Sequence, residues 1–190
     1  MWRGTMRFAT VMLVVLGSVA AGRPASADTN LLRNGGFEWP SLGGNMRSRQ
    51  FDAGQRIGSW RVTAGSVVTT TASPVYETPP VGLQAINLRP ALELADGEIC
   101  QTASGLVPGG AYKIRLLAAS VIEESAIDVT FDGVEVGHLD LLGGVPVVFK
   151  LYVWRVTAAA STAPFCLHGH PIGPYGYPIV DGVRIKPVTV

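Results

Sequence analysis

Apolar residues in this chain occur in short runs, most of which alternate with polar residues and end at turn-forming residues. The runs are rich in Val, Ile, Thr and aromatic residues, which favour β-strands, and no stretch gives a convincing amphipathic helix. The strands predicted from this pattern cover residues 31–32, 59–63, 66–71, 83–88, 98–102, 112–118, 126–131, 147–157, 164–168 and 179–185.

The segments between these runs contain residues that form tight turns. Asp132-Gly133 lies between two alternating segments, as in a two-residue hairpin, and Pro108-Gly109-Gly110 separates two others. The stretch 40–57 is polar and is predicted to be a long loop, which is either functional or a passive surface excursion. About ten short strands in one domain predict an all-β fold, a β-sandwich or jelly roll whose two sheets cover each other's inner faces.

The first 27 residues have the composition of a secretory signal peptide. Arg3 and Arg7 precede the apolar run 8–16, and Ala25-Ser26-Ala27 is a typical cleavage site. A retained membrane anchor is the alternative, but the run is shorter than the roughly 20 residues that span a bilayer. We therefore expect a secreted, extracellular protein in which residues 28–190 form a single domain with no membrane association after cleavage.

Removal of this leader changes the charge balance. The chain has 15 Lys and Arg and 14 Asp and Glu, and three of the arginines, Arg3, Arg7 and Arg23, lie in the leader. The 12 basic residues that remain (15 − 3) give a formal charge of −2 (12 − 14). Because phosphate binding needs a cationic surface and no cluster of Lys or Arg is present, the composition argues against a nucleic-acid partner.

The chain has two cysteines, Cys100 and Cys166. An even number of cysteines in an exported chain favours a disulfide, and a bridge that closes so long a loop would stabilise the fold by roughly 4 kcal/mol. The alternative is a pair of buried free thiols.

The sequence contains no recognisable catalytic signature. Neither a Gly-x-Ser-x-Gly nucleophile motif nor a phosphate-binding Gly-x-x-x-x-Gly-Lys-Ser/Thr motif is present. Glu123 and Glu124 are adjacent acids, and because neighbours on a strand point to opposite faces, this pair is not expected to flank one glycosidic bond. We therefore expect that the protein is not an enzyme.

His168-Gly169-His170 would present two imidazoles on one face if this segment is extended. Two imidazoles could begin a transition-metal site, but the spacing identifies no third ligand, and such sites normally need three or four. Solvated or hydrogen-bonded histidines are the favoured interpretation.

Six short motifs occur in an order that resembles the secreted galactose-binding-like β-sandwich proteins. The first is Asn30-Leu31-Leu32-Arg33-Asn34-Gly35-Gly36-Phe37-Glu38, and the others cover residues 58–62, 82–88, 99–102, 106–112 and 178–183. The resemblance is strongest to the bacterial choice-of-anchor C proteins and the plant cell-wall domain of unknown function 642, which are related to carbohydrate-binding modules. It implies a galactose-binding-like sandwich.

The same resemblance implies a structural calcium ion. In similar carbohydrate-binding modules, residues of the first and last motifs hold Ca²⁺, which here would be Glu38 and Asp181. Ca²⁺ takes about 6–8 oxygen ligands and would relieve the repulsion between two carboxylates. Asn87 and Gly182 depart from the pattern, since both stand where these relatives commonly have an aspartate. The alternative is that both carboxylates accept hydrogen bonds and bind no metal.

Aromatic residues in loops are the candidate ligand-binding side chains, because a flat ring stacks on the apolar face of a sugar while polar neighbours bind its hydroxyls. Trp39, Tyr175 and Tyr177 fall in loops, and Arg89 follows a predicted strand as a possible polar partner. These rings could instead simply close the ends of the sandwich. Two tryptophans fall within strand patterns and are expected in the core: Trp60 and Trp154.

These observations predict a secreted, non-catalytic binding module that recognises polysaccharide or another cell-wall carbohydrate. The alternative is a cell-surface structural or protein-interaction domain that uses an exposed sheet face.

Overall fold

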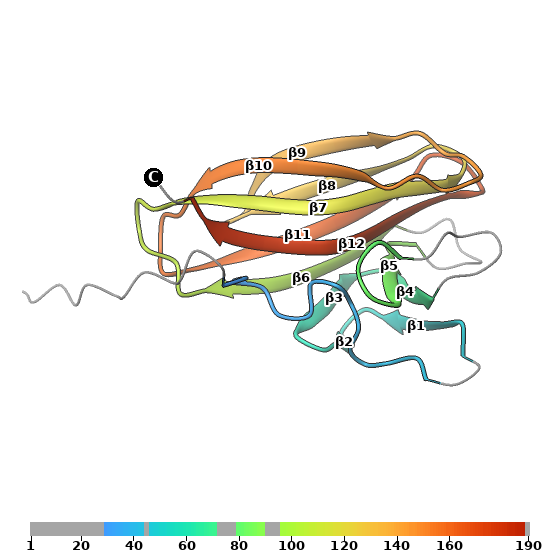
Figure 1. Cartoon of the computed structure of the whole chain (residues 1–190), viewed down its shortest axis with the longest axis horizontal. Helices are drawn as coiled ribbons and strands as arrows, with labels where there is room; N and C mark the ends of the chain where they lie inside the picture. Colours follow the sequence, from blue (N-terminus) through green and yellow to red (C-terminus); the bar gives the residue numbers. More distant parts are fainter. Residues whose placement is uncertain (1–28, 44–45, 72–78, 90–95, 189–190) are drawn as a thin grey trace, which may run out of the picture.

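The computed structural model describes residues 29–43, 46–71, 79–89 and 96–188, and within these ranges all regular structure is β-strand. Twelve strands form two sheets of six strands each, so the predicted β-sandwich is confirmed (Figure 1). The predicted signal peptide lies outside the described residues. Within the described ranges there is no helix with the length and apolar character to cross a bilayer.

Every neighbouring pair of strands in both sheets is antiparallel. Sheet A has the order β1 (Ser48–Asp52), β4 (Ser66–Thr71), β5 (Gln84–Asn87), β12 (Gly176–Pro187), β7 (Ala111–Ile122) and β10 (Lys150–Thr157). Sheet B has the order β2 (Arg56–Ile57), β3 (Trp60–Ala64), β6 (Gly97–Ser104), β11 (Thr162–Pro171), β8 (Ser125–Phe131) and β9 (Val134–Leu141).

The core lies between the sheets and follows the two-residue period of the strands. On β7, Tyr112, Ile114 and Leu116 are buried while the residues between them are exposed, as expected for a strand with one face on the core. Trp60 on β3 has no exposed surface and its ring contacts that of Phe165 on β11, at 6.0 Å between centroids. The prediction that Trp60 is a core residue is therefore confirmed.

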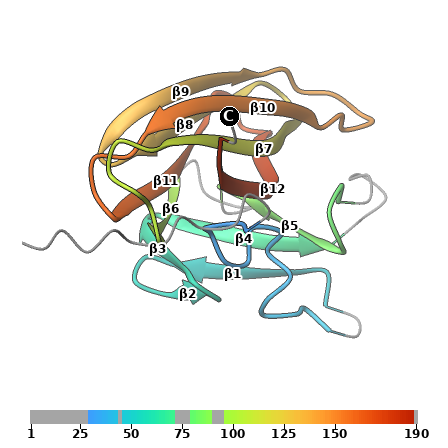
Figure 2. The same ribbon diagram turned by 60° about the vertical axis from the view of Figure 1, so that its left-hand side comes forward.

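Strands β9 and β10 belong to different sheets and lie side by side along one edge of the sandwich (Figures 1 and 2). Trp154 of β10 lies directly over Gly137 of β9, where any side chain would collide with the indole. Tyr152 stacks on Trp154 at 6.2 Å between ring centroids. Trp154 is thus half-buried and covers this edge of the core, rather than lying fully inside it as expected.

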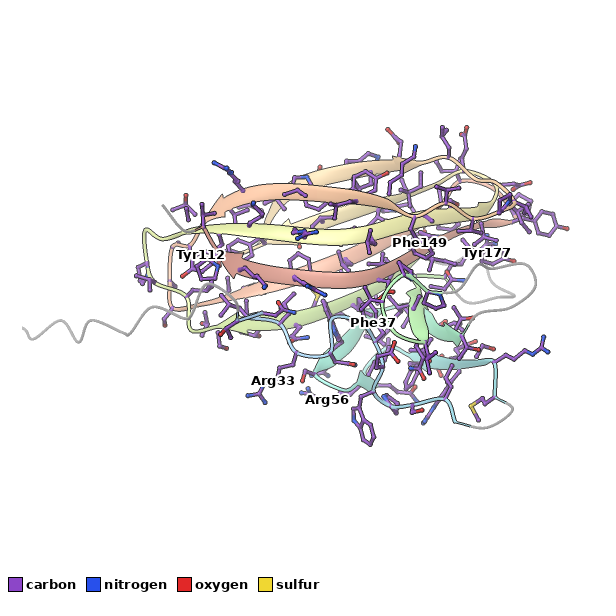
Figure 3. The ribbon with its side chains drawn as sticks, in the orientation of Figure 1. Arg33, Phe37, Arg56, Tyr112, Phe149 and Tyr177 are labelled. Atoms are coloured by element: carbon purple, nitrogen blue, oxygen red, sulfur yellow. A yellow bond between two sulfur atoms is a disulfide. The ribbon has the colours of Figure 1, made fainter. Side chains whose placement is uncertain are left out.

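A second, smaller apolar cluster lies on the outer face of sheet A. The segment 142–149 covers this face and buries Val147 against outward-pointing residues of β5, β7 and β12. Phe149 and Tyr177 pack on the same cluster and lie at one end of the molecule (Figure 3). The remaining members of this cluster are Ala85, Ala119, Val121 and Ile179.

Most predicted strands agree with the structure, but the apolar pair 31–32 forms a bend rather than the predicted strand, and two polar segments form strands that were not predicted. Residues 40–57 were predicted to be a loop, but they contain β1 and β2. Of the five β1 residues only Phe51 is buried, and β1 is held by its ladder to β4. Strand β9 was not predicted, although its hairpin turn was: Asp132 and Gly133 have φ angles of 56° and 75°, as a type I′ turn requires.

The predicted disulfide is present between Cys100 and Cys166. The two residues are direct partners in the ladder between β6 and β11, and both point away from the core. The bridge therefore ties two central strands of sheet B together on its outer face.

Candidate functional site

A hollow of about 570 Å³ opens at one end of the sandwich, where three chain segments meet. The first is the turn between β7 and β8, the second follows β9, and the third connects β11 to β12. The residues that line the hollow are Ile122, Glu123, Glu124, Leu142, Gly143, Ile172 and Gly173.

Close backbone approach brings these segments together. Gly143 lies against the backbone of residues 122 and 123, and Gly176 lies against the carbonyl of Glu124, so that a side chain at either glycine would collide with the main chain. Ile122 has a positive φ of 66°, which is rare for a β-branched residue and costs about 1–3 kcal/mol. The Ser120 hydroxyl helps to hold this strained turn, because it donates a 2.5 Å hydrogen bond to the Glu123 carbonyl.

Arg89 anchors the connection between β11 and β12 through its guanidinium group. Its Nη1 donates hydrogen bonds to the carbonyl oxygens of Gly173 (2.9 Å) and Gly176 (3.0 Å). The guanidinium lies over the Tyr177 ring, 4.9 Å from its centroid. Arg89 is only 3% exposed, and in this position its guanidinium holds the loop that carries Tyr175; its role as a direct polar partner of a ligand stays a prediction.

Tyr175 is the exposed aromatic side chain of this loop, with 55% of its surface accessible. Its backbone N–H donates a 3.1 Å hydrogen bond to Oε2 of Glu123, which fixes the loop to the turn between β7 and β8. The sequence thus identified three residues that meet at this end, Arg89, Tyr175 and Tyr177, and the structure gives each a different environment: buried, exposed and half-buried.

Glu123 and Glu124 both line this hollow, although as neighbours on a strand they would point to opposite faces. They lie in a bend between two strands rather than on a strand, so the rule that neighbours point to opposite faces does not apply, and both line the hollow. The turn was hidden because it lacks glycine and proline. Exposed Ile122, Leu142 and Ile172 complete a surface that combines apolar contacts with carboxylate acceptors.

Trp39 lies elsewhere. Its side chain is 67% exposed, so it does not close the end of the sandwich. Its backbone N–H and carbonyl both bind the Asn34 side chain, at 3.0 and 2.5 Å. The segment that carries it leads to β1, on the side of the molecule away from β9 and β10 (Figure 1).

Glu38 and Asp181 approach each other across Gly36: a Cβ atom at Gly36 would lie 3.8 Å from Oδ1 of Asp181 and 3.9 Å from Cγ of Glu38. Glu38 Oε1 accepts hydrogen bonds from the N–H groups of Leu83 and Gln84, both 2.9 Å long. The two carboxylates predicted to share a site are therefore neighbours.

Asp181 is fully buried at an irregularity in the pairing of β12 with β7, where Gly182 has a positive φ of 61°. Its Oδ2 accepts a hydrogen bond from the Val81 N–H (2.8 Å) and its Oδ1 one from the Gly182 N–H (2.6 Å). Burial raises the pKa of Asp181 to about 7; the two N–H groups oppose this rise, and the charge of Glu38 adds to it.

A second hollow, of about 490 Å³, lies beside β2 and β6. Figure 3 shows two of its residues, Arg33 and Arg56, together and well away from Tyr177. No aromatic residue lines this hollow, and its other lining residues are Thr29, Asn30, Leu31, Ser59, Gln101, Thr102 and Ser104.

No protein-family model and no curated protein matches this chain. Solved structures do match. TmCBM61, solved in complex with β-1,4-galactotriose, aligns with a TM-score of 0.53 and 17% identity over 84% of this chain and 99% of that chain. The CBM22-1 xylan-binding domain of Paenibacillus barcinonensis Xyn10C aligns with a TM-score of 0.50 and 13% identity over 75% of this chain and 94% of that chain.

The enzymatically active domain of tailspike protein 4 from bacteriophage CBA120 also aligns, with a TM-score of 0.51 and 17% identity over 84% of this chain. This chain spans only about a fifth of that domain, since the alignment covers 21% of it. At these identities the comparisons establish a shared fold: the chain has the β-sandwich of carbohydrate-binding modules.

Proposed function

We propose that this protein is a secreted, non-catalytic module that binds polysaccharide through the hollow between the three end segments. The observation that carries the proposal is that exposed Tyr175 is tied through its backbone N–H to Glu123, which lines one hollow together with exposed apolar residues, on a fold shared with carbohydrate-binding modules. A sugar ring would stack on Tyr175 while its hydroxyls donate to the Glu123 and Glu124 carboxylates. The predicted signal peptide and the resemblance of the sequence motifs to cell-wall proteins support an extracellular carbohydrate as the ligand.

Rigidity at this end of the molecule supports binding. Arg89 holds two loop carbonyls and Glu123 holds the Tyr175 N–H, so the aromatic platform is ordered before the ligand arrives. Ordering a loop before binding removes an entropic cost that the complex would otherwise carry.

One similar structure was solved in complex with β-1,4-galactotriose, and another is a xylan-binding domain. We therefore test galactan and xylan first, with cellulose, pectin and peptidoglycan beside them. Retention of the protein on one of these, with no release of reducing sugar, is the expected result. Failure to bind any of them would contradict the proposal, and hydrolysis would contradict the non-catalytic part of it.

Substitution of exposed aromatics locates the site. Tyr175→Ala should weaken binding roughly tenfold, which corresponds to about 1.4 kcal/mol of lost stacking. Trp39→Ala is the matched control, because Trp39 is also an exposed aromatic residue but lies on another part of the surface. If Trp39→Ala abolished retention and Tyr175→Ala did not, the hollow would be the wrong site.

We also propose that Glu38 and Asp181 hold a structural Ca²⁺. The two carboxylates are adjacent, one is fully buried, and a cation would offset the charge that burial penalises. When bound, the ion would supply positive charge between the first motif and β12. The four backbone N–H groups that bind these carboxylates are the competing means of stabilising them.

A further inference from the structure

All three histidines of the chain lie on the outer face of sheet B. His168 and His170 are on β11, where the alternate residues 165, 167 and 169 face the core and are buried. His138 is on the edge strand β9, and Asp128 on β8 lies between the two groups as the ladder partner of both His168 and His138.

These imidazoles alternate with carboxylates in a continuous row. Asp96 Oδ2 lies 3.5 Å from His168 Nε2 and 3.1 Å from His170 Nδ1. On its other side, His170 Nε2 lies 2.6 Å from Asp128 Oδ2. The row continues from Asp128 to His138 Nδ1 at 2.5 Å.

The geometry points to a binding site for a divalent transition metal ion of the zinc class, formed by Asp96, His168 and His170. One ligand atom of each residue lies within 4.8 Å of the other two. Tetrahedral zinc with bonds of roughly 2.0–2.2 Å places neighbouring ligand atoms about 3.3–3.6 Å apart, which the separations of 3.5 and 3.1 Å approach without rearrangement of the backbone. Imidazole nitrogen with carboxylate oxygen is a ligand set that suits zinc. A fourth position would remain for water.

Asp128 supports this arrangement without contacting the metal. A proton on His170 Nε2 donated to Asp128 leaves the Nδ1 lone pair directed at the Asp96 side, and ligating histidines in metalloproteins are held by this kind of carboxylate contact. Asp128 is therefore positioned to orient His170.

The charges of the cluster favour a cation. The five ion pairs formed among the described residues all join these histidines to Asp96, Asp128 or Asp140, and none brings in a Lys or Arg. With neutral imidazoles, the aspartates carry negative charge that a divalent ion would balance. The third ligand was invisible in the sequence because Asp96 is 74 residues from His170.

The test is calorimetric titration of Zn²⁺ into the full chain, purified without a polyhistidine tag. We expect about one Zn²⁺ per chain, with no comparable response to Mg²⁺. Asp128→Asn should raise the Kd by about 10–100-fold, and His168→Ala or His170→Ala by at least as much. His138→Asn is the matched control, since it removes a histidine from the same face but not a ligand, and should leave the Kd unchanged.

Co²⁺ supplies a second measurement that does not depend on any variant. Four-coordinate Co²⁺ absorbs visible light much more strongly than hydrated, six-coordinate Co²⁺, so the wild-type protein should intensify the colour of added Co²⁺ and Zn²⁺ should reverse it. Absence of Zn²⁺ binding, six-coordinate Co²⁺, or unchanged binding in a folded His168→Ala/His170→Ala variant would overturn the proposal.

Discussion

Asp181 is a carboxylic acid with no exposed surface, and its pKa depends on the charges and N–H groups that lie close to it. Two backbone N–H groups favour the anion, while burial and the neighbouring Glu38 disfavour it, and burial is the strongest of these effects. The protein therefore carries at this position a group that is partly protonated near neutral pH, unless a cation stabilises its charge.

This predicts a pH dependence of stability in the metal-free protein. Because the pKa of Asp181 is about 7 when folded and near its ordinary value of 3.8 when unfolded, the folded state binds more protons between these pH values. The contribution of Asp181 to the free energy of unfolding is fully present below pH 4 and falls by up to about 4 kcal/mol as the pH rises to 7 and above. Denaturant unfolding in the presence of EDTA at about pH 4.5 and about pH 8 measures this change in the free energy of unfolding.

Asp181→Asn is the control, because it should lose this component of the slope while retaining side-chain hydrogen bonding. Calcium should raise the unfolding temperature of the wild type at the higher pH and have no effect on Asp181→Asn. An equal slope in both proteins would contradict the assigned pKa, and an unfolding temperature that ignores calcium would contradict the metal site alone.

Single residues of the candidate site differ in how far the sequence could identify them. Tyr175 and Tyr177 were identifiable because they lie in a loop rich in glycine and proline. Arg89 was identified as a partner, but its burial depends on the carbonyls of Gly173 and Gly176, which only the folded loop brings to it. Sequence position alone cannot separate an anchoring arginine from one that touches a ligand.

Among the elements, the disulfide between β6 and β11 joins strands that are already paired through their backbones. Its contribution lies mainly in the unfolded chain, where it closes a loop between residues 66 positions apart. Loop-closure entropy gives about 4 kcal/mol for a loop of this length, and measured values are commonly lower.

The Cys100→Ser/Cys166→Ser variant should accordingly lose roughly 2–4 kcal/mol of unfolding free energy. Both residues are half-buried on the outer face, so serine is accommodated without a core cavity. Reduced wild-type protein is the matched control and should show the same loss in chemical denaturation. A loss below about 0.5 kcal/mol would indicate that the unfolded chain is not constrained by the bridge.

Among the strands, the sequence pattern predicted those that bury an apolar face and missed those held mainly by backbone pairing with a neighbouring strand. Strand β4 was predicted with its observed bounds because its Val and Thr residues favour strands. Strand β1 has one buried residue in five, so it carries no alternating pattern, and β9 is mostly exposed except at Leu139 and Leu141. Such edge strands form because a neighbouring strand pairs with them, and not because of a pattern in their own sequence.

For the whole molecule, the sandwich architecture leaves its ends and the outer face of sheet B available for binding. The end hollow is lined by two carboxylates and exposed apolar residues, and the connection that forms one of its walls also carries exposed Tyr175, whereas the hollow near Arg33 and Arg56 has no exposed apolar wall of this kind. One similar structure with this fold is a complex with β-1,4-galactotriose, and another is a xylan-binding domain. Fold alone does not choose the ligand, since binding depends on the side chains of the site.

The most direct test of the carbohydrate site is NMR chemical-shift mapping with an oligosaccharide from the polysaccharide that retains the protein. The account predicts that the backbone amides of residues 122–124, 142–143, 172–173 and 175–177 shift, and that Tyr175→Ala strongly reduces these shifts at a ligand concentration near the wild-type Kd. Shifts confined to the surroundings of Arg33 and Arg56, or of Trp39, would contradict it.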